Sequence, residues 1–398
     1  MNINIQATKI KGKINAIASK SFAHRILICD FLAGNPLRKE FDGFTSKDIL
    51  ATYNCLSDIK KGARKIDCDE SGSTLRFLLP LCASLGGEFI FTGRGRLLSR
   101  PNTELLLALS ENGITFEEND GYIKISGKLK SGEFKIKGDI SSQYVSGLIM
   151  ALSSLDGDSR IILTTPLASK PYVDITISVL NGYGIEIETT DYGYFIKGWQ
   201  KFSGKMQTEG DWSNMAFYLV LGAINGEITI SGLNLDSVQG DKKILEILKS
   251  AGATVFCDKN GITVSKSQLK GFTMDAENCP DLVPICAVLG AVASGTTIIN
   301  KIERLKIKES DRVLSTIDML RAFGIKAEEK DNALIIYGGK IKGGKVNSFN
   351  DHRIVMASAV LGAVADGESQ IIDADAVQKS YPTFFKDFNS VGGKASEN

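Results

Sequence analysis

Four cationic side chains stand near the starts of segments that are typical of helices. Lys20 and Arg25 belong to one such segment, Arg76 to a second and Arg353 to a third. The partial positive charge at a helix N-terminus disfavours cations there. An anion bound at these ends would contact the free N–H groups and would also offset the added positive charge. The pattern therefore predicts a site for small anions that carry phosphate or carboxylate groups.

Hydroxyl, amide and further charged groups occur in other short clusters. Ser141-Ser142-Gln143 offers two hydroxyls and an amide, which suit a phosphate group. Gly72 would let an anion approach backbone N–H groups closely. Taken alone, each cluster is more typical of a solvated surface, so only their combination indicates a site. The remaining clusters are Arg94-Gly95-Arg96, Arg100-Pro101, Ser169-Lys170-Pro171-Tyr172 and 306–312.

Composition and charge exclude several classes of protein. The 398 residues carry a net charge of +1, so no overall field attracts nucleic acid or a membrane surface. No G-x-x-x-x-G-K-[ST] phosphate loop occurs, and two His with seven scattered Cys do not indicate a metal site. The N-terminus lacks the regions of a signal peptide, and the apolar run 283–299 is shorter than a membrane span. We expect a cytoplasmic protein without nucleic-acid or membrane partners and without a metal.

A repeat of about 70 residues positions the candidate groups. Each block opens with Ser or Asp, preferred helix N-caps, and reaches a Gly, a preferred helix stop, about four turns later. Each block therefore predicts one helix. Five blocks begin 70 residues apart, at Ser71, Ser141, Asp211, Asp281 and Asp351, and their glycines are Gly86, Gly157, Gly226, Gly295 and Gly367. A sixth, shorter-spaced copy runs from Ser19 to Gly34.

Between these helices lies a second repeated element. Residues 317–337 predict a helix, a turn and two strands, and similar patterns occur at 245–264, 177–196 and 105–125. The repeating unit is β-α-β-α-β-β, present about six times, with cores shared between neighbours. A solenoid without chemistry would have the same period, so the repeat alone leaves that alternative open. The tail 392–398 is expected to be frayed.

Five motifs follow one another along the chain. They are Ser19-Lys20-Ser21…Arg25, Ser141-Ser142-Gln143, Lys308-Glu309-Ser310-Asp311-Arg312, Asn350-Asp351-His352-Arg353 and Lys379-Ser380-Tyr381-Pro382. In this order, over essentially the whole chain, they resemble the 5-enolpyruvylshikimate-3-phosphate synthases of the enolpyruvyl transferase family. The resemblance implies an α/β fold of two domains, each with three repeats arranged as an inside-out α/β barrel. It places one domain at 1–14 plus 207–398 and the other at 15–206, with the active site in the interdomain cleft.

The resemblance also implies a reaction. The enolpyruvyl group of phosphoenolpyruvate is transferred to the 5-hydroxyl of shikimate 3-phosphate by addition and elimination through a tetrahedral intermediate, and phosphate is released. This step belongs to the shikimate pathway, which leads to chorismate and the aromatic amino acids. The family implies no cofactor, a monomer, and inhibition by glyphosate in competition with phosphoenolpyruvate.

Matching positions assign candidate roles to residues of this chain. By resemblance, Asp281, Glu309, Lys20 and Lys308 are catalytic, with Asp281 as the base towards the 5-hydroxyl and Glu309 as a proton carrier at the methylene carbon. The shikimate 3-phosphate ligands would be Lys20, Ser21, Arg25, Ser141, Ser142, Gln143, Ser169, Tyr172, Asp281 and Lys308. The phosphoenolpyruvate ligands would be Lys20, Gly72, Arg76, Arg100, Gln143, Arg312, Arg353 and Lys379.

Three alternatives are weighed against this interpretation. UDP-N-acetylglucosamine enolpyruvyl transferases share the repeat but carry a Cys where this chain has Gly95. A non-catalytic anion-binding paralogue would be expected to lack Asp281, Lys308 or Glu309, and all three are present. An RNA 3′-phosphate cyclase would need a late His nucleophile and a basic surface, and neither is apparent in the sequence. The chain departs from the family pattern at Ile17-Ala18, Glu70 and Phe77. It also departs at Lys47, a position where an acidic residue is expected.

Overall fold

The computed structural model describes residues 1–397 and forms two compact units. Unit 1 comprises Met1–Ile17 with Glu209–Asn398, and unit 2 comprises Ala18–Thr208. Unit 2 is therefore a continuous insertion between two elements of unit 1, strand β2 (Lys11–Asn15) and helix α7 (Trp212–Asn225). None of the helices in residues 1–397 combines the length and apolarity that a membrane crossing requires.

Five four-stranded sheets share one topology. Within a repeat, the second strand is parallel to the first and the fourth strand is antiparallel to the second. The third strand is antiparallel to the fourth and lies at the edge of the sheet. Unit 2 contains β3 (Lys65–Asp67), β4 (Gly87–Thr92), β6 (Ile123–Gly127) and β5 (Ile114–Glu118), and then β7 (Glu133–Ile136), β8 (Ser159–Leu163), β10 (Gly193–Ile196) and β9 (Ile187–Thr190).

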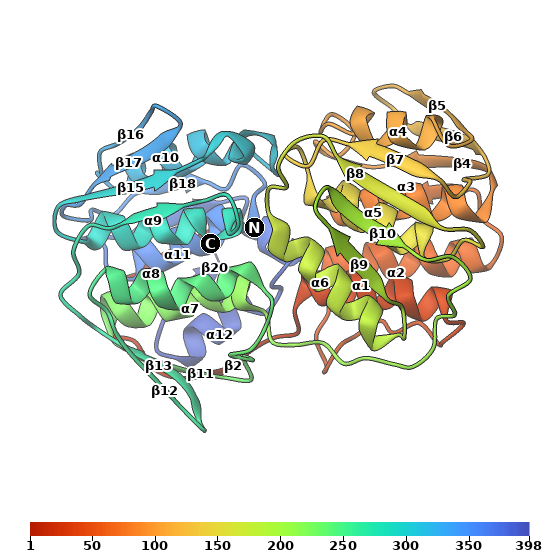
Figure 1. The fold of residues 1–398 in the computed structure, drawn as a ribbon. Helices are drawn as coiled ribbons and strands as arrows, with labels where there is room; N and C mark the ends of the chain where they lie inside the picture. Colours follow the sequence, from red (N-terminus) through yellow and green to blue (C-terminus); the bar gives the residue numbers. More distant parts are fainter. Residues whose placement is uncertain (398) are drawn as a thin grey trace. The chain divides into compact units, whose positions relative to one another are not determined.

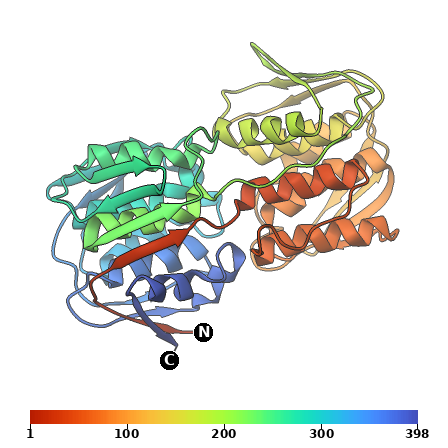
Figure 2. The same cartoon turned by 90° about the horizontal axis from the view of Figure 1, so that it is seen from below.

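The three sheets of unit 1 follow the same order. Their strands are β2, β11 (Glu227–Ser231), β13 (Gly261–Ser265) and β12 (Thr254–Asp258); β14 (Thr273–Asp275), β15 (Thr296–Asn300), β17 (Ala333–Tyr337) and β16 (Ala327–Lys330); and β18 (Lys345–Asn347), β19 (Ser369–Ile372), β1 (Ile3–Gln6) and β20 (Lys394–Glu397). Both chain ends thus enter one sheet, where β1 pairs with β19 and β20 (Figure 2). The prediction of a frayed tail is wrong for 394–397, and Asn398 lies outside the described residues.

The first helix of each repeat is buried on nearly all sides. These helices are α1 (Lys20–Leu32), α3 (Gly72–Leu85), α5 (Ser142–Leu152), α7, α9 (Val283–Val292) and α11 (His352–Gly362). In unit 1, α7, α9 and α11 pack together between the sheets (Figure 1). Helices that are apolar all round belong in a core, and α9 reads VPICAVLGAV. The arrangement of helices inside and sheets outside agrees with the fold predicted for each unit.

The second helices of the repeats bury one face. They are α2 (Lys47–Lys60), α4 (Thr103–Ser110), α6 (Lys170–Gly182), α8 (Ile244–Ser250), α10 (Arg312–Ala322) and α12 (Phe384–Ser390). Short 3₁₀ helices complete unit 1: η1 (Gly240–Lys243), η2 (Pro280–Leu282), η3 (Glu303–Ile307) and η4 (Ala374–Lys379).

The sixth repeat differs from the expected unit. It supplies α1 and α2, but among residues 1–397 it has no four-stranded sheet of its own, and an isolated bridge joins Phe41 to Phe44. A polar network occupies this part of unit 2 instead. Buried Asp30 accepts hydrogen bonds from Tyr183 Oη at 2.6 Å and Arg38 Nη2 at 2.9 Å. The connecting segment 33–46 contains Gly, Asn and Pro without apolar alternation, which favours turns over strands.

The predicted helix stops are partly correct. Gly86 and Gly226 end α3 and α7 directly. Helices α5, α9 and α11 end earlier, at Leu152, Val292 and Gly362, so Gly157, Gly295 and Gly367 belong to the following turns.

Candidate active site

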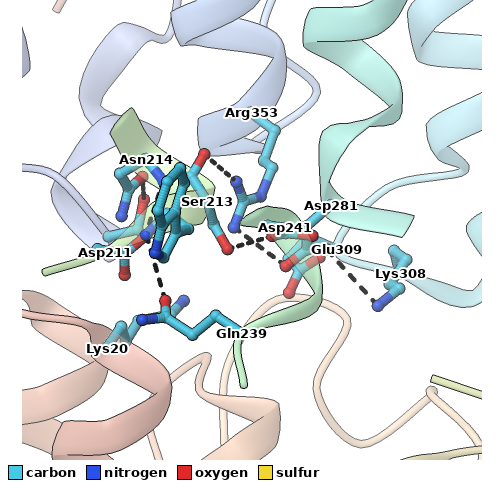
Figure 3. A network of polar contacts seen from close by, with 12 residues as sticks. Lys20, Asp211, Ser213, Asn214, Gln239, Asp241, Asp281, Lys308, Glu309 and Arg353 are labelled. Carbon is cyan, nitrogen blue, oxygen red and sulfur yellow. Dashed lines mark hydrogen bonds and ion pairs between the residues drawn. The ribbon is translucent and has the colours of Figure 1, made fainter. Parts of the chain in front are cut away.

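Asp281 departs from its repeat-equivalent residues. Asp211 and Asp351 accept hydrogen bonds from backbone N–H groups at the starts of α7 and α11. Asp281 instead lies within η2, ahead of α9, and its carboxylate accepts hydrogen bonds from Arg312 Nη1 at 2.8 Å and Arg353 Nη2 at 3.0 Å. Lys308 Nζ is 3.7 Å from the same carboxylate (Figure 3). The N-caps of η2 and α9 are Cys279 and Leu282 and not Asp281, which the sequence predicted as a cap, and three cations surround the Asp281 carboxylate.

Arg312 connects three carboxylates. It is the first residue of α10 and only 1% exposed, with Nε 2.9 Å from Asp351, Nη1 2.8 Å from Asp281 and Nη2 2.6 Å from Glu309. Asp311 caps α10 and so fixes the position from which the Arg312 side chain leaves the helix. Because charged hydrogen bonds are strong and directional, this guanidinium fixes the relative positions of Asp281, Glu309 and Asp351.

The pKa values of Asp281 and Lys308 are both lowered, but for different reasons. Burial by itself would raise the pKa of Asp281, but the charges of Arg353, Lys308 and Arg312 outweigh it and hold that pKa well below its usual range. Burial lowers the pKa of Lys308 to about 8, although Asp281 opposes the shift. Asp281 is therefore a carboxylate at neutral pH, while Lys308 is a cation that can release its proton near that pH.

Arg353 and Lys379 are the two further cationic candidates that the sequence placed in the C-terminal part of unit 1. Arg353 donates to the Ser213 carbonyl at 3.2 Å, and Lys379 at the end of η4 donates to the Asn350 carbonyl at 2.7 Å. Both side chains are buried. Unit 1 thus brings together five of the candidates that the sequence placed in it, Asp281, Lys308, Glu309, Arg312 and Arg353. The sixth, Lys379, contacts Asn350, the residue before Asp351.

In unit 2, Lys20 forms an ion pair that the sequence did not assign. Its Nζ is 2.8 Å from Asp48 Oδ2, and both side chains are largely buried. Asp48 is in the first turn of α2, capped by Ser46. The family pattern predicts an acidic residue at Lys47, and the structure supplies the carboxylate one residue later. An acidic residue in a first helical turn was the available signal.

Arg25 is anchored among three helices. Its Nε donates to Thr176 Oγ1 at 2.6 Å, and its two Nη atoms donate to the carbonyls of Ser21 and Tyr172, each at 2.8 Å. A fourth bond reaches Ser146 Oγ at 3.3 Å. Four of the five guanidinium N–H groups thus bond within residues 1–397, which leaves one donor for a ligand. Burial lowers the pKa of Arg25 to about 9.

Arg76, Gln143 and Ser73 connect the starts of α3 and α5. Arg76 Nη1 donates to Gln143 Oε1 at 2.7 Å, and Gln143 Nε2 donates to Ser73 Oγ at 3.0 Å. At the first residue of α3, a Cβ on Gly72 would lie 2.8 Å from Arg100 Nη1. The Arg100 guanidinium therefore lies directly against the glycine, where it needs the absence of a side chain.

The predicted phosphate-binding hydroxyls occupy two helix starts. Ser141 caps α5, and both it and Ser142 are less than one-tenth exposed. Ser169 precedes α6 in the left-handed conformation, with φ of 56°. The Tyr172 N–H donates to the Ser169 carbonyl at 3.1 Å. Unit 2 thus joins Ser21, Arg25, Ser169 and Tyr172 in one network, and Arg76 with Gln143 in another.

A line of hydrogen bonds joins α1, α2 and α3. His24 Nδ1 is 2.7 Å from Thr52 Oγ1, Thr52 is 2.7 Å from Thr74 Oγ1, and Thr74 donates to the cap Ser71 at 2.7 Å. Because each hydroxyl has one proton, the order Thr74 to Ser71 requires Thr52 to donate to Thr74 and His24 Nδ1–H to donate to Thr52. The neutral imidazole of His24 thereby supports the first turn of α3.

Protonation of His24 should destabilise unit 2. His24 Nε2 is buried without a hydrogen-bond partner among residues 1–397, and burial, followed by Lys20 and Arg25, holds the pKa well below 6.5. The unfolded chain binds the extra proton first as pH falls, so stability decreases below about pH 6.5 by about 1.4 kcal/mol per pH unit. Urea unfolding of wild type and His24→Asn at several pH values measures this. An identical pH dependence in both proteins would contradict it.

Comparison with solved structures identifies the fold. The solved EPSP synthase of Acinetobacter baumannii superposes with a TM-score of 0.80 at 24% identity, and each chain is covered completely. The enolpyruvyl transferase NikO of Streptomyces tendae gives 0.76 at 16% identity, over 100% of this chain and 98% of that one. The fold is therefore that of the enolpyruvyl transferases, as the sequence predicted.

Sequence comparison is more specific. The family model for EPSP synthase (3-phosphoshikimate 1-carboxyvinyltransferase) matches residues 57–388. The 3-phosphoshikimate 1-carboxyvinyltransferase of Clostridium novyi is 42% identical over 100% of this chain and 98% of its own length. That of Brachyspira hyodysenteriae is 40% identical over 99% of both chains. The chain belongs to the EPSP synthase family.

Proposed function

We propose that this chain transfers the enolpyruvyl group of phosphoenolpyruvate to the 5-hydroxyl of shikimate 3-phosphate, in the pathway to chorismate and the aromatic amino acids. Family membership over the whole chain makes it a transferase of this class. The observation that carries the proposal is the Asp281 carboxylate held among Lys308, Arg312 and Arg353. This cluster places a proton acceptor beside cations that suit phosphate and carboxylate groups.

The residues of unit 1 have distinct roles in this proposal. Asp281 binds the 5-hydroxyl and accepts its proton as the oxygen bonds to the central carbon of phosphoenolpyruvate. Glu309, held by Arg312, gives its proton to the methylene carbon on addition and takes one back on elimination, and the leaving phosphate takes the proton from Asp281. Lys308, Arg312, Arg353 and Lys379 stabilise the charges of both substrates and of the intermediate. As substrate anions engage Lys308 and Arg353, less positive charge acts on Asp281, and its basicity rises.

Unit 2 supplies the remaining contacts. Ser141, Ser142 and Ser169 are proposed to bind the phosphate of shikimate 3-phosphate, with Gln143 and Tyr172 beside them. Ser21 and the remaining donor of Arg25 are proposed to bind its carboxylate. Lys20, Gly72 N–H, Arg76 and Arg100 are assigned to phosphoenolpyruvate. We further propose that both groups of residues face one interdomain cleft, that the protein is a cytoplasmic monomer, and that it acts without nucleic-acid or membrane partners.

Phosphate release from phosphoenolpyruvate tests the function. We expect release that depends on shikimate 3-phosphate and not on UDP-N-acetylglucosamine. Release with the UDP-sugar alone would assign the cell-wall reaction instead. Binding of shikimate 3-phosphate without release would indicate the non-catalytic paralogue. Lys20→Met should abolish release, because the proposed contact with both substrates is lost.

Gly72→Ala should weaken phosphoenolpyruvate binding. The new methyl group would displace the Arg100 guanidinium, so we expect KM for phosphoenolpyruvate to rise about ten-fold, equivalent to about 1.4 kcal/mol. KM for shikimate 3-phosphate should change much less. Gly121→Ala is the matched control, because its Cβ meets only Asn119 Oδ1, at 3.5 Å. Equal effects of the two variants in steady-state kinetics would contradict the assignment.

Glyphosate should inhibit in competition with phosphoenolpyruvate. It is an anion with phosphonate and carboxylate groups, and the cations assigned to phosphoenolpyruvate would bind both. Initial rates measured at several concentrations of each compound check this. Unchanged rates at glyphosate far above KM for phosphoenolpyruvate would refute the prediction.

A further inference from the structure

A second carboxyl group stands next to the Asp281 cluster, and none of the roles above uses it. Asp241 lies in η1, and its Oδ2 accepts a hydrogen bond from Ser213 Oγ in the first turn of α7. The Ser213 carbonyl accepts from Arg353 Nη1 at 3.2 Å, and Arg353 Nη2 donates to Asp281 at 3.0 Å. Asp241, Ser213, Arg353 and Asp281 therefore form one continuous line of contacts (Figure 3).

The surroundings of Asp241 do not suit an isolated charge. The residue is 3% exposed, and its Oδ1 is buried without a hydrogen-bond partner among residues 1–397. The neighbouring cations of η1 point elsewhere, since Lys242 donates to the Leu235 carbonyl and Lys243 pairs with Glu246 of α8. A buried carboxylate with one hydrogen bond and no ion pair is costly. Such a group is not explained by stability.

Helix capping does not explain Asp241 either. The start of α7 already has its acceptors: Asp211 accepts from Asn214 N at 2.7 Å, and Gln239 Oε1 accepts from Trp212 N at 3.2 Å. Within residues 1–397, the Asp241 carboxyl group has one hydrogen bond, from the side chain of Ser213, the residue whose carbonyl orients Arg353. This placement connects Asp241 to the site and not to the helix.

We propose that Asp241 is a positioning residue for the Arg353–Asp281 pair, acting through Ser213 and working in its protonated form. The proposal rests on the function proposed above, in which Arg353 and Asp281 contact the substrates. With Asp241 uncharged, Arg353 keeps its ion pair with Asp281 and its net attraction for substrate anions. With Asp241 ionised, a second negative charge competes for Arg353 and weakens that attraction.

The charges around Asp241 support this assignment. Burial, and then the charge of Asp281, raise the pKa of Asp241 to about 7, while Arg353 and the Ser213 hydrogen bond act in the opposite direction. The other titratable groups that interact with it are Asp211 and the thiols of Cys279 and Cys286. Two nearby carboxyl groups thus have opposite tendencies, Asp281 ionised and Asp241 protonated, as expected where like charges share a site.

The protonated form of Asp241 determines how kcat/KM for phosphoenolpyruvate should change with pH. As pH rises through about 7, Asp241 loses its proton, so kcat/KM for phosphoenolpyruvate should fall about ten-fold for each pH unit above the midpoint. Lys308, with a pKa of about 8, contributes a separate loss at higher pH. Substrate phosphates also titrate near neutrality, but that contribution is the same for every variant and cancels in ratios of variant to wild type.

The test compares pH profiles of kcat/KM for wild type, Asp241→Asn, Ser213→Ala and Asp30→Asn. Asp241→Asn should lose the decline near pH 7 and keep the one near pH 8. Ser213→Ala removes a bond to the ionised form, so its decline should move to higher pH. Asp30→Asn is the matched control, an equally buried Asp in unit 2, and should keep the wild-type midpoint. A decline near pH 7 that persists in Asp241→Asn would overturn the proposal.

A second measurement does not depend on turnover. Infrared spectra at pH 6 should show a protonated carboxyl band that is absent in Asp241→Asn and present in Asp30→Asn. If wild type shows this band but no release that depends on shikimate 3-phosphate, the proposed function fails while the protonated state of Asp241 stands. If wild type turns over and the band is unchanged in Asp241→Asn, the inference about Asp241 fails alone.

Discussion

Asp281→Asn should lower kcat by about three orders of magnitude, within the range that general acid–base catalysis contributes. The amide cannot accept the 5-hydroxyl proton, and its loss of charge leaves Lys308, Arg312 and Arg353 without the carboxylate they share. Single-turnover phosphate release measures the chemical step directly.

The repeat supplies a control for Asp281→Asn. Asp211 is the equivalent residue of the preceding repeat and serves as the N-cap of α7, a role that Asn performs as well. Asp211→Asn should therefore reduce kcat far less. A loss of similar size in both variants would mean that Asp281 acts through the structure of unit 1 and not as a base.

Arg312→Met should destabilise unit 1 by about 3–5 kcal/mol and abolish turnover. Removing one partner of a buried ion pair leaves uncompensated charge, and Arg312 faces Asp281, Glu309 and Asp351, the last fully buried. For a unit of this size the expected fall in melting temperature is roughly 10 °C. Calorimetry or circular dichroism measures it.

Arg321→Met is the matched control for Arg312→Met. Arg321 is on the same helix and pairs with Asp318, but its side chain is 72% exposed. Surface ion pairs contribute at most about 1 kcal/mol, so the melting temperature should change little. A small effect at Arg312 as well would show that solvent already screens the cluster.

The sequence predicts the fold because local signals repeat. Ser71, Ser141, Asp211 and Asp351 act as N-caps where the 70-residue period places them. It does not predict that the sixth repeat lacks its own sheet, because that difference depends on tertiary contacts such as Asp30 with Arg38. Strand β20 was missed for the same reason, since its partner β1 lies at the other end of the chain.

For the candidate site, residue types were predictable but partners were not. The motifs single out Lys20, Lys308 and Arg312. The carboxylate partners of two of them, Asp48 for Lys20 and Asp351 for Arg312, are distant in sequence and become evident only in the folded chain. Asp241 carries no motif, and only its burial and its contact with Ser213 draw attention to it.

The insertion of unit 2 into unit 1 sets an order for folding during synthesis. Unit 2 is continuous, so every residue it needs has left the ribosome once Thr208 has emerged. Strand β1 must wait for β19 and β20, whose residues are translated more than 360 positions later. Domains generally fold as units as they emerge. During synthesis, unit 2 can therefore fold first, and the sheet that contains β1, β19 and β20 forms last.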